Sequence, residues 1–236
     1  MALLLDRQGD QIQITEDVVK AAAGNEWSGK DIMALLLDEQ GDQIQITEDV
    51  VVATAGNWKS GTDIMALLLD QRGDQIQITE NVVVAAAGNE DSGTDIMALL
   101  LDRRGDQIQI TQDVVVAVAG NEESGKDIMA LLLDQRGDQV QITEDVVKAA
   151  AANRGSGTDI MALLLDQQGD QIQITDDVVK AAAANRGSGT DIMALLLDRR
   201  GDQIQITEDV VVAAAGNENS GTDIMALLDR QGDLRS

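Results

Sequence analysis

One pattern of apolar and polar positions recurs every 32 residues along the chain. Each copy opens with the apolar run M-A-L-L-L-D, at residues 1, 33, 65, 97, 129, 161 and 193. Seven copies fill residues 1–224, and a shorter copy occupies residues 225–236. A fixed period of this length is typical of proteins in which each unit buries its apolar face against the next unit. We therefore predict a single repeat array over residues 1–236, without a linker inside it.

The segment 28–38 predicts the first helix of the unit, with about ten helical residues. Its central run, residues 32–37, is apolar all round, so we expect this helix to be buried between neighbouring units. Ser28 lies where an N-terminal cap belongs, and Asp31 three residues later approximates a capping box. Gly41 follows the helix and suits a left-handed residue that ends it.

A short extended segment and a second helix complete the unit. The alternation of D-Q-I-Q-I at residues 42–46 places both isoleucines on one side, which predicts an extended segment. The string T-E-D-V-V-V-A-T-A at residues 47–55 predicts a helix that begins with a capping threonine, as Thr15 does in the first unit. The Gly-Asn pair at residues 56–57 suits a left-handed helix end. The predicted fold class is all-α: an α-solenoid of stacked helical hairpins, with a short extended turn in each unit.

One asparagine follows the second helix in every unit, and two structural roles fit it. The identical residues are Asn25, Asn57, Asn89, Asn121, Asn153, Asn185 and Asn217. We favour a left-handed cap at the end of the helix. The alternative is a ladder of side-chain hydrogen bonds that runs down the stack.

The composition excludes several kinds of metal site, cross-link and catalytic site. The chain has no His, Cys, Pro, Tyr or Phe. An ordinary zinc site, a disulfide framework and a Ser-His or Cys-His nucleophile pair are therefore excluded. Every unit carries the same carboxylates, so no single pair stands out for acid–base catalysis. We expect a non-enzymatic protein without a cofactor. The net charge of −25 argues against nucleic acid and against an anionic membrane as partners.

Two strings in each unit carry a resemblance to a known family. The string T-E-D-V-V-x-A-A-A-G-N looks like T-P-L-H-x-A-A-x-x-G-N, and D-I-M-A-L-L-L-D-x-x-G-D looks like E-I-V-K-L-L-L-E-A-G-A-D. The unit thus resembles an ankyrin repeat, although T-E-D-V replaces the T-P-L-H tetrapeptide at residues 15–18. It is also similar to the near-identical A-A-A-G-N tandem repeats of large fungal NLR-type proteins. This resemblance covers essentially the whole chain and implies a recognition or interaction array.

A column of variable positions is one candidate surface for a protein partner. The column is Lys at residues 20, 148 and 180, and it is Val at Val52, Val84, Val116 and Val212. If the column is exposed, Val52, Val84 and Val116 form an apolar stripe over three successive units, and such patches often mark interaction sites. The alternative is a half-buried column in which Lys lays its methylene stem across a neighbouring unit.

The two tryptophans are a second candidate surface. Trp27 and Trp58 are the only aromatic residues, and both fall in the variable loop between the helices. Tryptophan is a common anchor in protein interfaces. Neutral drift in a loop is the alternative explanation.

The acidic columns allow two further functions. The segment that begins at Leu4 mimics an EF-hand, with Asp6, Asp10 and Asp17 at loop positions 1, 5 and 12. It lacks the glycine that a calcium loop needs at its sixth position, so a calcium-responsive array is a weak alternative. Together with Asp31, these columns could also recruit a basic partner. A solvated face that keeps the array soluble is the interpretation that we favour.

The leading hypothesis is a non-enzymatic protein-interaction or recognition array in the cytoplasm. The run at Met1 has no basic region and is too short for a secretion signal. It begins in the middle of a predicted helix, so uncapped ends could favour head-to-tail self-association. The alternative function is a structural spacer, or an artificial repeat scaffold without a natural ligand. Linked differences favour a natural array: Lys148 with Lys180, Ala152 with Ala184, and Arg-Gly at 154–155 and 186–187.

Overall fold

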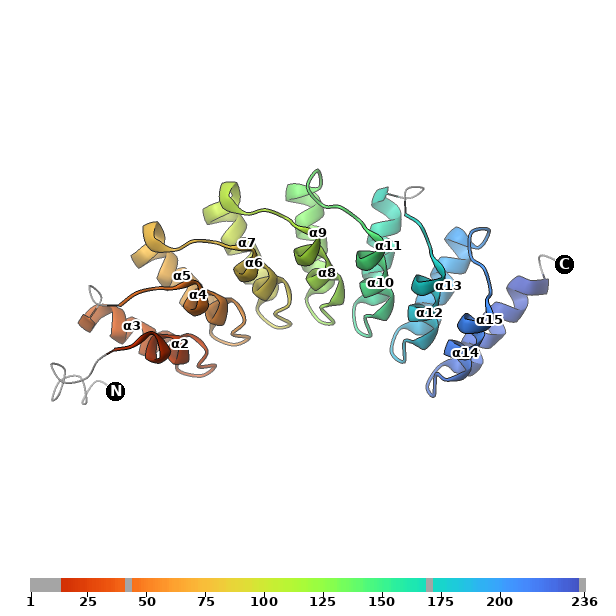
Figure 1. The fold of residues 1–236 in the computed structure, drawn as a ribbon, viewed down its shortest axis with the longest axis horizontal. Helices are drawn as coiled ribbons and strands as arrows, with labels where there is room; N and C mark the ends of the chain where they lie inside the picture. The colour runs from red at the N-terminus through yellow and green to blue at the C-terminus, as the bar shows by residue number, and fades with distance from the viewer. Residues whose placement is uncertain (1–13, 41–43, 169–171, 234–236) are drawn as a thin grey trace. The chain divides into compact units, whose positions relative to one another are not determined.

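The computed structural model describes residues 14–40, 44–168 and 172–233 (Figure 1). This part of the chain forms 14 α-helices and two 3₁₀ helices, and it contains no strand. The predicted all-α class, a solenoid of helical hairpins, is confirmed.

Shorter and longer helices alternate along the chain. The shorter helices are α2 (Glu16–Ala23), α4 (Glu48–Ala55), α6 (Glu80–Ala87), α8 (Gln112–Gly120), α10 (Glu144–Ala152), α12 (Asp176–Ala184) and α14 (Glu208–Ala215). The longer helices are α3 (Gly29–Gln40), α5 (Gly61–Arg72), α7 (Gly93–Arg104), α9 (Gly125–Arg136), α11 (Gly157–Gln168), α13 (Gly189–Arg200) and α15 (Gly221–Asp233). The 3₁₀ helices η3 (Gly73–Gln75) and η4 (Gly105–Gln107) follow α5 and α7.

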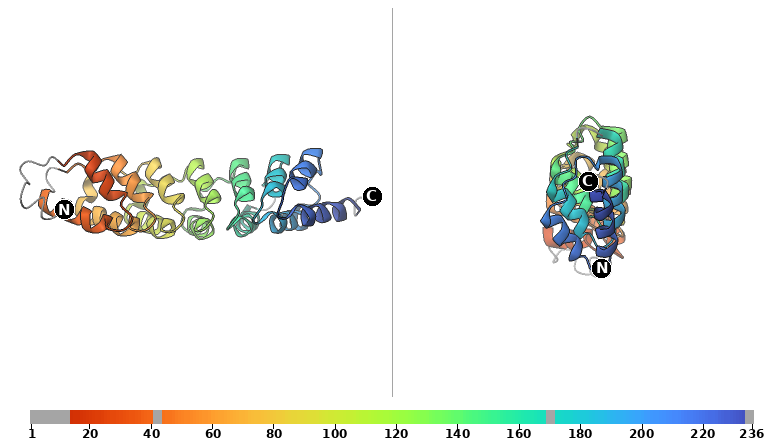
Figure 2. Two further views of the ribbon diagram at one scale, coloured as in Figure 1. Left: turned by 90° about the horizontal axis from the view of Figure 1, so that it is seen from below. Right: turned by 90° about the vertical axis from the view of Figure 1, so that its right-hand side faces the viewer.

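The helices pack as hairpins in two layers inside each of two compact units, residues 1–109 and residues 110–236. In the first unit, α4 contacts its hairpin partner α5 and the short helices α2 and α6 of the adjacent repeats. In the second unit, α12 contacts α13, α10 and α14 in the same way. The long helices contact one another in a layer of their own, as α5 does with α3 and α7 (Figure 2).

The core of each repeat comes from both helices and from the segment between repeats. In α5, Ile64, Met65 and Leu68 are fully buried. The short helix α4 buries Val50, Val51, Thr54 and Ala55, whose small side chains let it approach both of its neighbours. Ile76 and Ile78 are buried while Gln77 between them is exposed, so the predicted extended alternation is correct.

A glycine begins each long helix because two helices approach closely there. A Cβ atom on Gly61 would lie 2.7 Å from the Thr54 carbonyl oxygen and 3.0 Å from Ile96 Cδ1. The equivalent Cβ would also approach a carbonyl oxygen of the short helix at Gly29, Gly125, Gly157, Gly189 and Gly221. The long helix therefore starts directly against the last turns of the short helix.

The predicted left-handed helix ends are wrong. Gly41 lies outside the described residues, and its counterparts Gly73 and Gly105 are right-handed, each with φ of −49°. There the chain continues from the long helix into a 3₁₀ turn. At the end of α4, Gly56 has φ of −83°. Its N–H donates to the Val52 carbonyl at 2.9 Å, so right-handed geometry already satisfies the last carbonyl groups.

Candidate functional site

The buried asparagine column fixes the loops between the two helices of each repeat. Asn57 is 3% exposed, and its Nδ2 donates to the carbonyl oxygens of Ala23 (2.8 Å) and Asn25 (3.0 Å) in the preceding repeat. Its Oδ1 accepts from the backbone N–H groups of Lys59 (3.1 Å) and Ser60 (2.9 Å). One carboxamide therefore shapes its own loop and ties that loop to the neighbouring repeat.

This arrangement is the hydrogen-bonded ladder, the second of the two roles that the sequence predicts for the column. Other residues of the column also donate from Nδ2 to the preceding repeat, among them Asn89, Asn153, Asn185 and Asn217. The left-handed cap is wrong, because Asn121 is extended with φ of −73° and ψ of 114°. Asn25 makes the hydrogen bonds within its own loop, since its Oδ1 accepts from the backbone N–H groups of Trp27 and Ser28.

The serine column binds adjacent loops together instead of capping its own helix. Ser60 Oγ donates to the Glu26 carbonyl at 2.6 Å, and Ser92 Oγ donates to the Trp58 carbonyl at 2.6 Å. Ser60 makes no side-chain cap on α5. At Ser28 the backbone N–H is bound by the asparagine carboxamide at 2.8 Å, so the predicted capping box with Asp31 is replaced.

The two tryptophans lie on adjacent loops of the first unit, with a lysine between their rings. Trp27 is 79% exposed and Trp58 is 40% exposed. The ammonium group of Lys59 lies 3.1 Å from the ring centroid of Trp27 and 4.6 Å from that of Trp58. Both distances are within the range of a cation–π contact. We call these three residues the Trp-Lys-Trp cluster.

Sequence reasoning selects the two tryptophans but not Lys59. The signal lies in the register of the repeat, because residue 59 occupies the position of Trp27 in the next 32-residue repeat. Residues in one column lie on neighbouring loops, and residue 58 is adjacent in sequence. The three side chains are thus brought together by the 32-residue period itself.

A single family model matches the chain seven times. Its description is Domain of unknown function (DUF7104), and it matches residues 3–33, 35–65, 67–97, 99–129, 131–161, 163–193 and 195–225. The chain belongs to the DUF7104 family. The matches follow one another at the predicted spacing of 32 residues. No curated protein and no solved structure matches this chain.

The valine column of the DUF7104 repeats does not form the exposed stripe. Val52, Val84 and Val116 are all half-buried. Where the column is lysine, the side chain extends toward the next repeat, and Lys20 Nζ lies 2.6 Å from Asp49 Oδ2. The three valines of the predicted stripe therefore follow the half-buried alternative. Lys20, Lys148 and Val212 of the same column are exposed, Val212 with 63% of its surface.

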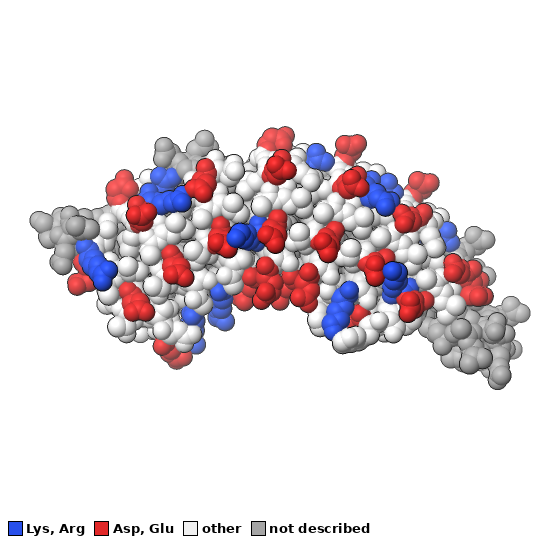
Figure 3. Space-filling view, turned by 180° about the vertical axis from the view of Figure 1, so that it is seen from behind, with Lys and Arg blue, Asp and Glu red and all other residues white. Residues whose placement is uncertain are grey.

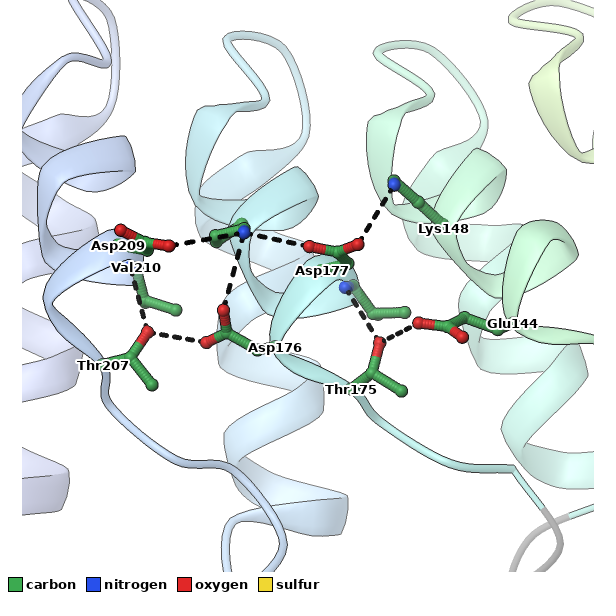
Figure 4. Close-up of polar contacts among 10 residues, drawn as sticks. Glu144, Lys148, Thr175, Asp176, Asp177, Thr207, Asp209 and Val210 are labelled. Atoms are coloured by element: carbon green, nitrogen blue, oxygen red, sulfur yellow. Dashed lines mark hydrogen bonds and ion pairs between the residues drawn. The ribbon is translucent and has the colours of Figure 1, made fainter.

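Lysines and acidic residues form a chain of ion pairs on the short helices of the second unit (Figure 4). Lys148 Nζ lies 3.5 Å from Asp177, and Lys180 Nζ lies 2.9 Å from Asp177 and 3.6 Å from Asp209. The hydrogen bond from Lys180 holds the pKa of Asp177 below its usual value. The same bond raises the pKa of Lys180. These acidic columns thus link one DUF7104 repeat to the next.

The capping threonines also reach the preceding repeat. Thr15 has the extended conformation of an N-cap, and its carbonyl accepts from Val18 N at 3.0 Å, but its side chain makes no cap. Thr175 Oγ1 donates to Glu144 at 2.6 Å while it accepts from Val178 N at 3.4 Å (Figure 4). The hydroxyl therefore serves both its helix and the contact between repeats.

Acidic side chains predominate on the face shown in Figure 3, and basic side chains are scattered among them. Among the described residues, no three Asp or Glu side chains gather as a metal site would require. Asp6 and Asp10 of the EF-hand-like segment lie outside the described residues, as does Met1 with the predicted N-terminal face. The described helices include none that is long and apolar enough to cross a membrane.

A small open cavity of about 240 Å³ lies at the C-terminal ends of the long helices α5 and α7, in the first unit. Its lining includes Arg72 and Arg104 together with Asp70 and Asp74. Asp70 is already paired with Arg103 at 2.9 Å. Charges of both signs line this cavity, so it selects no ligand by charge.

Proposed function

We propose that this DUF7104 chain is a non-enzymatic recognition array that binds a protein partner through the loop edge of its first unit. The observation that carries the proposal is the Trp-Lys-Trp cluster, in which two tryptophans lie side by side and exposed on adjacent loops. Large exposed aromatic surface is unusual on a soluble domain, and tryptophan is enriched among the residues that dominate binding energy.

The loop framework supports this proposal because it holds the tryptophans in place before a partner arrives. The backbone N–H of Trp27 donates to Asn25 Oδ1 at 3.1 Å, and the backbone carbonyl of Trp58 accepts from Ser92 Oγ at 2.6 Å. A preorganised anchor loses less conformational entropy on binding than a mobile one does.

The pattern of variation supports it as well. The tip of the loop holds Glu26, Trp58 and Glu90 in one column and Trp27, Lys59 and Asp91 in the next, over an unchanged asparagine and serine framework. Variable tips on a constant scaffold suit a surface that sets specificity. The resemblance to ankyrin repeats and to the A-A-A-G-N arrays of fungal NLR-type proteins belongs to this proposal, as do a cytoplasmic location and a partner that is neither nucleic acid nor membrane.

Affinity capture from a lysate of the source organism tests the proposal. The control bait carries Trp27→Asp and Trp58→Glu, which place in these columns the residues already present at Asp91 and Glu90. Circular dichroism checks that both baits are folded. We expect a partner that the unaltered array retains and the control bait loses. Equal capture by both baits, or capture by neither, would contradict the proposal.

A structural spacer is the second candidate function. The contacts that the acidic columns make between repeats favour it, such as Thr175 with Glu144 and Lys148 with Asp177. A spacer has no specific partner. If the chain is a spacer, no captured protein should bind the unaltered array and fail to bind the control bait.

A further inference from the structure

We propose that the Trp-Lys-Trp cluster is a binding site for a cationic side chain, and that its occupant is an Arg or Lys in a basic segment of the partner. Lys59 fills the site until the partner displaces it. This inference rests on the proposed function and names the chemistry of the partner.

The geometry of the cluster is that of a cation site. One ammonium group contacts two indole rings, at 3.1 Å and 4.6 Å from their centroids. The rings come from loops that hydrogen bonds attach to each other, since Ser60 Oγ donates to the Glu26 carbonyl at 2.6 Å. Lys59 instead reaches the rings on a flexible four-carbon stem. The backbone positions from which the two rings project are therefore kept when the stem swings away.

Lys59 differs from the other lysines in the interactions of its ammonium group. The chain has six lysines, and five of them lie within 4 Å of a carboxylate: Lys20, Lys30, Lys126, Lys148 and Lys180. Lys59 forms no ion pair within the part of the chain that the structure describes. Its displacement from the rings breaks no ion pair, so a competing cation has only the two ring contacts to replace.

Charge selects the sign of the occupant. The chain carries a net charge of −25, and Glu26, Glu90 and Asp91 are at the loop tips that flank the cluster. A cation is attracted to this surface and an acidic segment is repelled. The indole faces favour the same sign, because the ring quadrupole attracts cations. A basic segment with an Arg or Lys satisfies both conditions.

Intrinsic fluorescence tests the proposal directly, because the chain contains two tryptophans and no tyrosine. The emission therefore reports on this cluster alone. The probe is a blocked peptide, Gly-Ser-Arg-Gly-Lys-Gly-Ser, and the control peptide has Glu in place of Arg and Lys. We expect a saturable change in emission with the basic peptide and none with the acidic peptide.

The variant Lys59→Met removes the internal competitor and is expected to bind the basic peptide about three- to ten-fold more tightly. Lys30→Met is the matched control, since it makes the same change of charge in the same unit, where Lys30 pairs with Asp63 at 3.3 Å. It is expected to bind as the unaltered chain does. Equal affinities of the two variants, or no response to the basic peptide, would overturn the inference.

The two proposals fail in different ways. A captured partner that the Trp27→Asp, Trp58→Glu bait loses, but that the basic peptide does not displace, leaves the proposed function standing and overturns the cation site. Displacement of that partner by the basic peptide, and not by the acidic one, supports both.

Discussion

At the scale of single residues, the asparagine column carries the contacts between repeats. Both hydrogens of the Asn57 carboxamide donate to backbone carbonyls of the preceding repeat, and its oxygen accepts two backbone N–H groups of its own loop. A buried amide that is fully satisfied in this way stabilises the fold, whereas an incomplete one costs the desolvation of every group left unpaired.

Asn57→Ala is therefore expected to lower the free energy of unfolding by roughly 2–4 kcal/mol, more than a typical point substitution. Urea unfolding followed by circular dichroism measures the change. Asn219→Ala is the control, because the Nδ2 of that exposed residue donates once, to the Arg186 carbonyl at 3.1 Å. It should lie within about 0.5 kcal/mol of the unaltered chain. A loss at Asn57 no larger than at Asn219 would contradict the role of the ladder.

Asn57→Asp removes the hydrogen-bond donor of this side chain, Nδ2, and keeps the acceptor, Oδ1. The new carboxylate would face the carbonyl oxygens of Ala23 and Asn25, so burial and repulsion should raise its pKa above that in the unfolded chain. A raised folded pKa means that stability is lost as the pH rises through it. This variant should therefore approach the stability of the unaltered chain at low pH, where the protonated carboxyl can donate again, and fall away from it near neutral pH.

Glu48 titrates in the opposite sense. Its carboxylate accepts from Thr79 Oγ1 at 2.7 Å and from Asn81 Nδ2 at 2.9 Å, and these bonds lower its pKa. The stabilisation they give is present above the unfolded pKa and is lost as the pH falls through the lower, folded value. Thr79→Val should raise the Glu48 pKa toward its usual value, measured by NMR of the side-chain carboxyl carbon. Thr62→Val, which removes a buried hydroxyl without a hydrogen-bond partner among the described residues, should leave it unchanged.

At the scale of elements, the apolar pattern predicts where the helices lie, and backbone contacts between elements decide how they end. The alternation of residues 42–46 and the apolar run 32–37 are local signals, so both elements follow from the sequence. The roles of Gly61 and Asn57 depend on a carbonyl that lies on another helix or in another repeat. The pairing of the tryptophans around Lys59 likewise depends on the register of adjacent loops, which no local pattern contains.

The two glycines of one hairpin should respond oppositely to the same substitution. Gly61→Ala drives a Cβ to 2.7 Å from a backbone oxygen of Thr54, and overpacking of this kind costs about 1–3 kcal/mol. Gly56→Ala places the Cβ 3.5 Å from the Val52 carbonyl, in a helical conformation, and should gain up to ~1 kcal/mol. The equivalent positions Ala152 and Ala184 already carry alanine. Thermal unfolding compares the two, and equal effects would contradict this account of the close contact.

At the scale of the whole molecule, two electrostatic effects compete. Ion pairs join successive repeats, but their side chains are largely exposed, and exposed pairs contribute little. Against them stands the self-repulsion of 42 acidic residues with 17 basic ones. Salt screens both the ion pairs and the self-repulsion. The direction in which salt changes the stability therefore shows which of the two effects is larger.

We expect repulsion to dominate. The Tm should therefore rise with sodium chloride between about 0.01 M, where the Debye length is ~30 Å, and 1 M, where it is ~3 Å. Each kcal/mol regained corresponds to about 2–4 °C in a chain of this size. A Tm that falls over this range would mean that the ion pairs between repeats outweigh the net charge.

Lys180 provides the local test of the same balance. Its ammonium lies within 3.6 Å of Asp176, Asp177 and Asp209. Lys180→Gln therefore removes this cation from three carboxylates and leaves Asp177 with Lys148 alone, at 3.5 Å. Among the residues that the structure describes, Lys30 pairs with Asp63 alone, and Lys30→Gln removes that pair. The first variant should lower the Tm more than the second at low salt, and the gap should close at high salt, because screened carboxylates repel one another less. A gap that stays constant with salt would assign the loss to packing of the lysine stem across the next repeat instead of to charge.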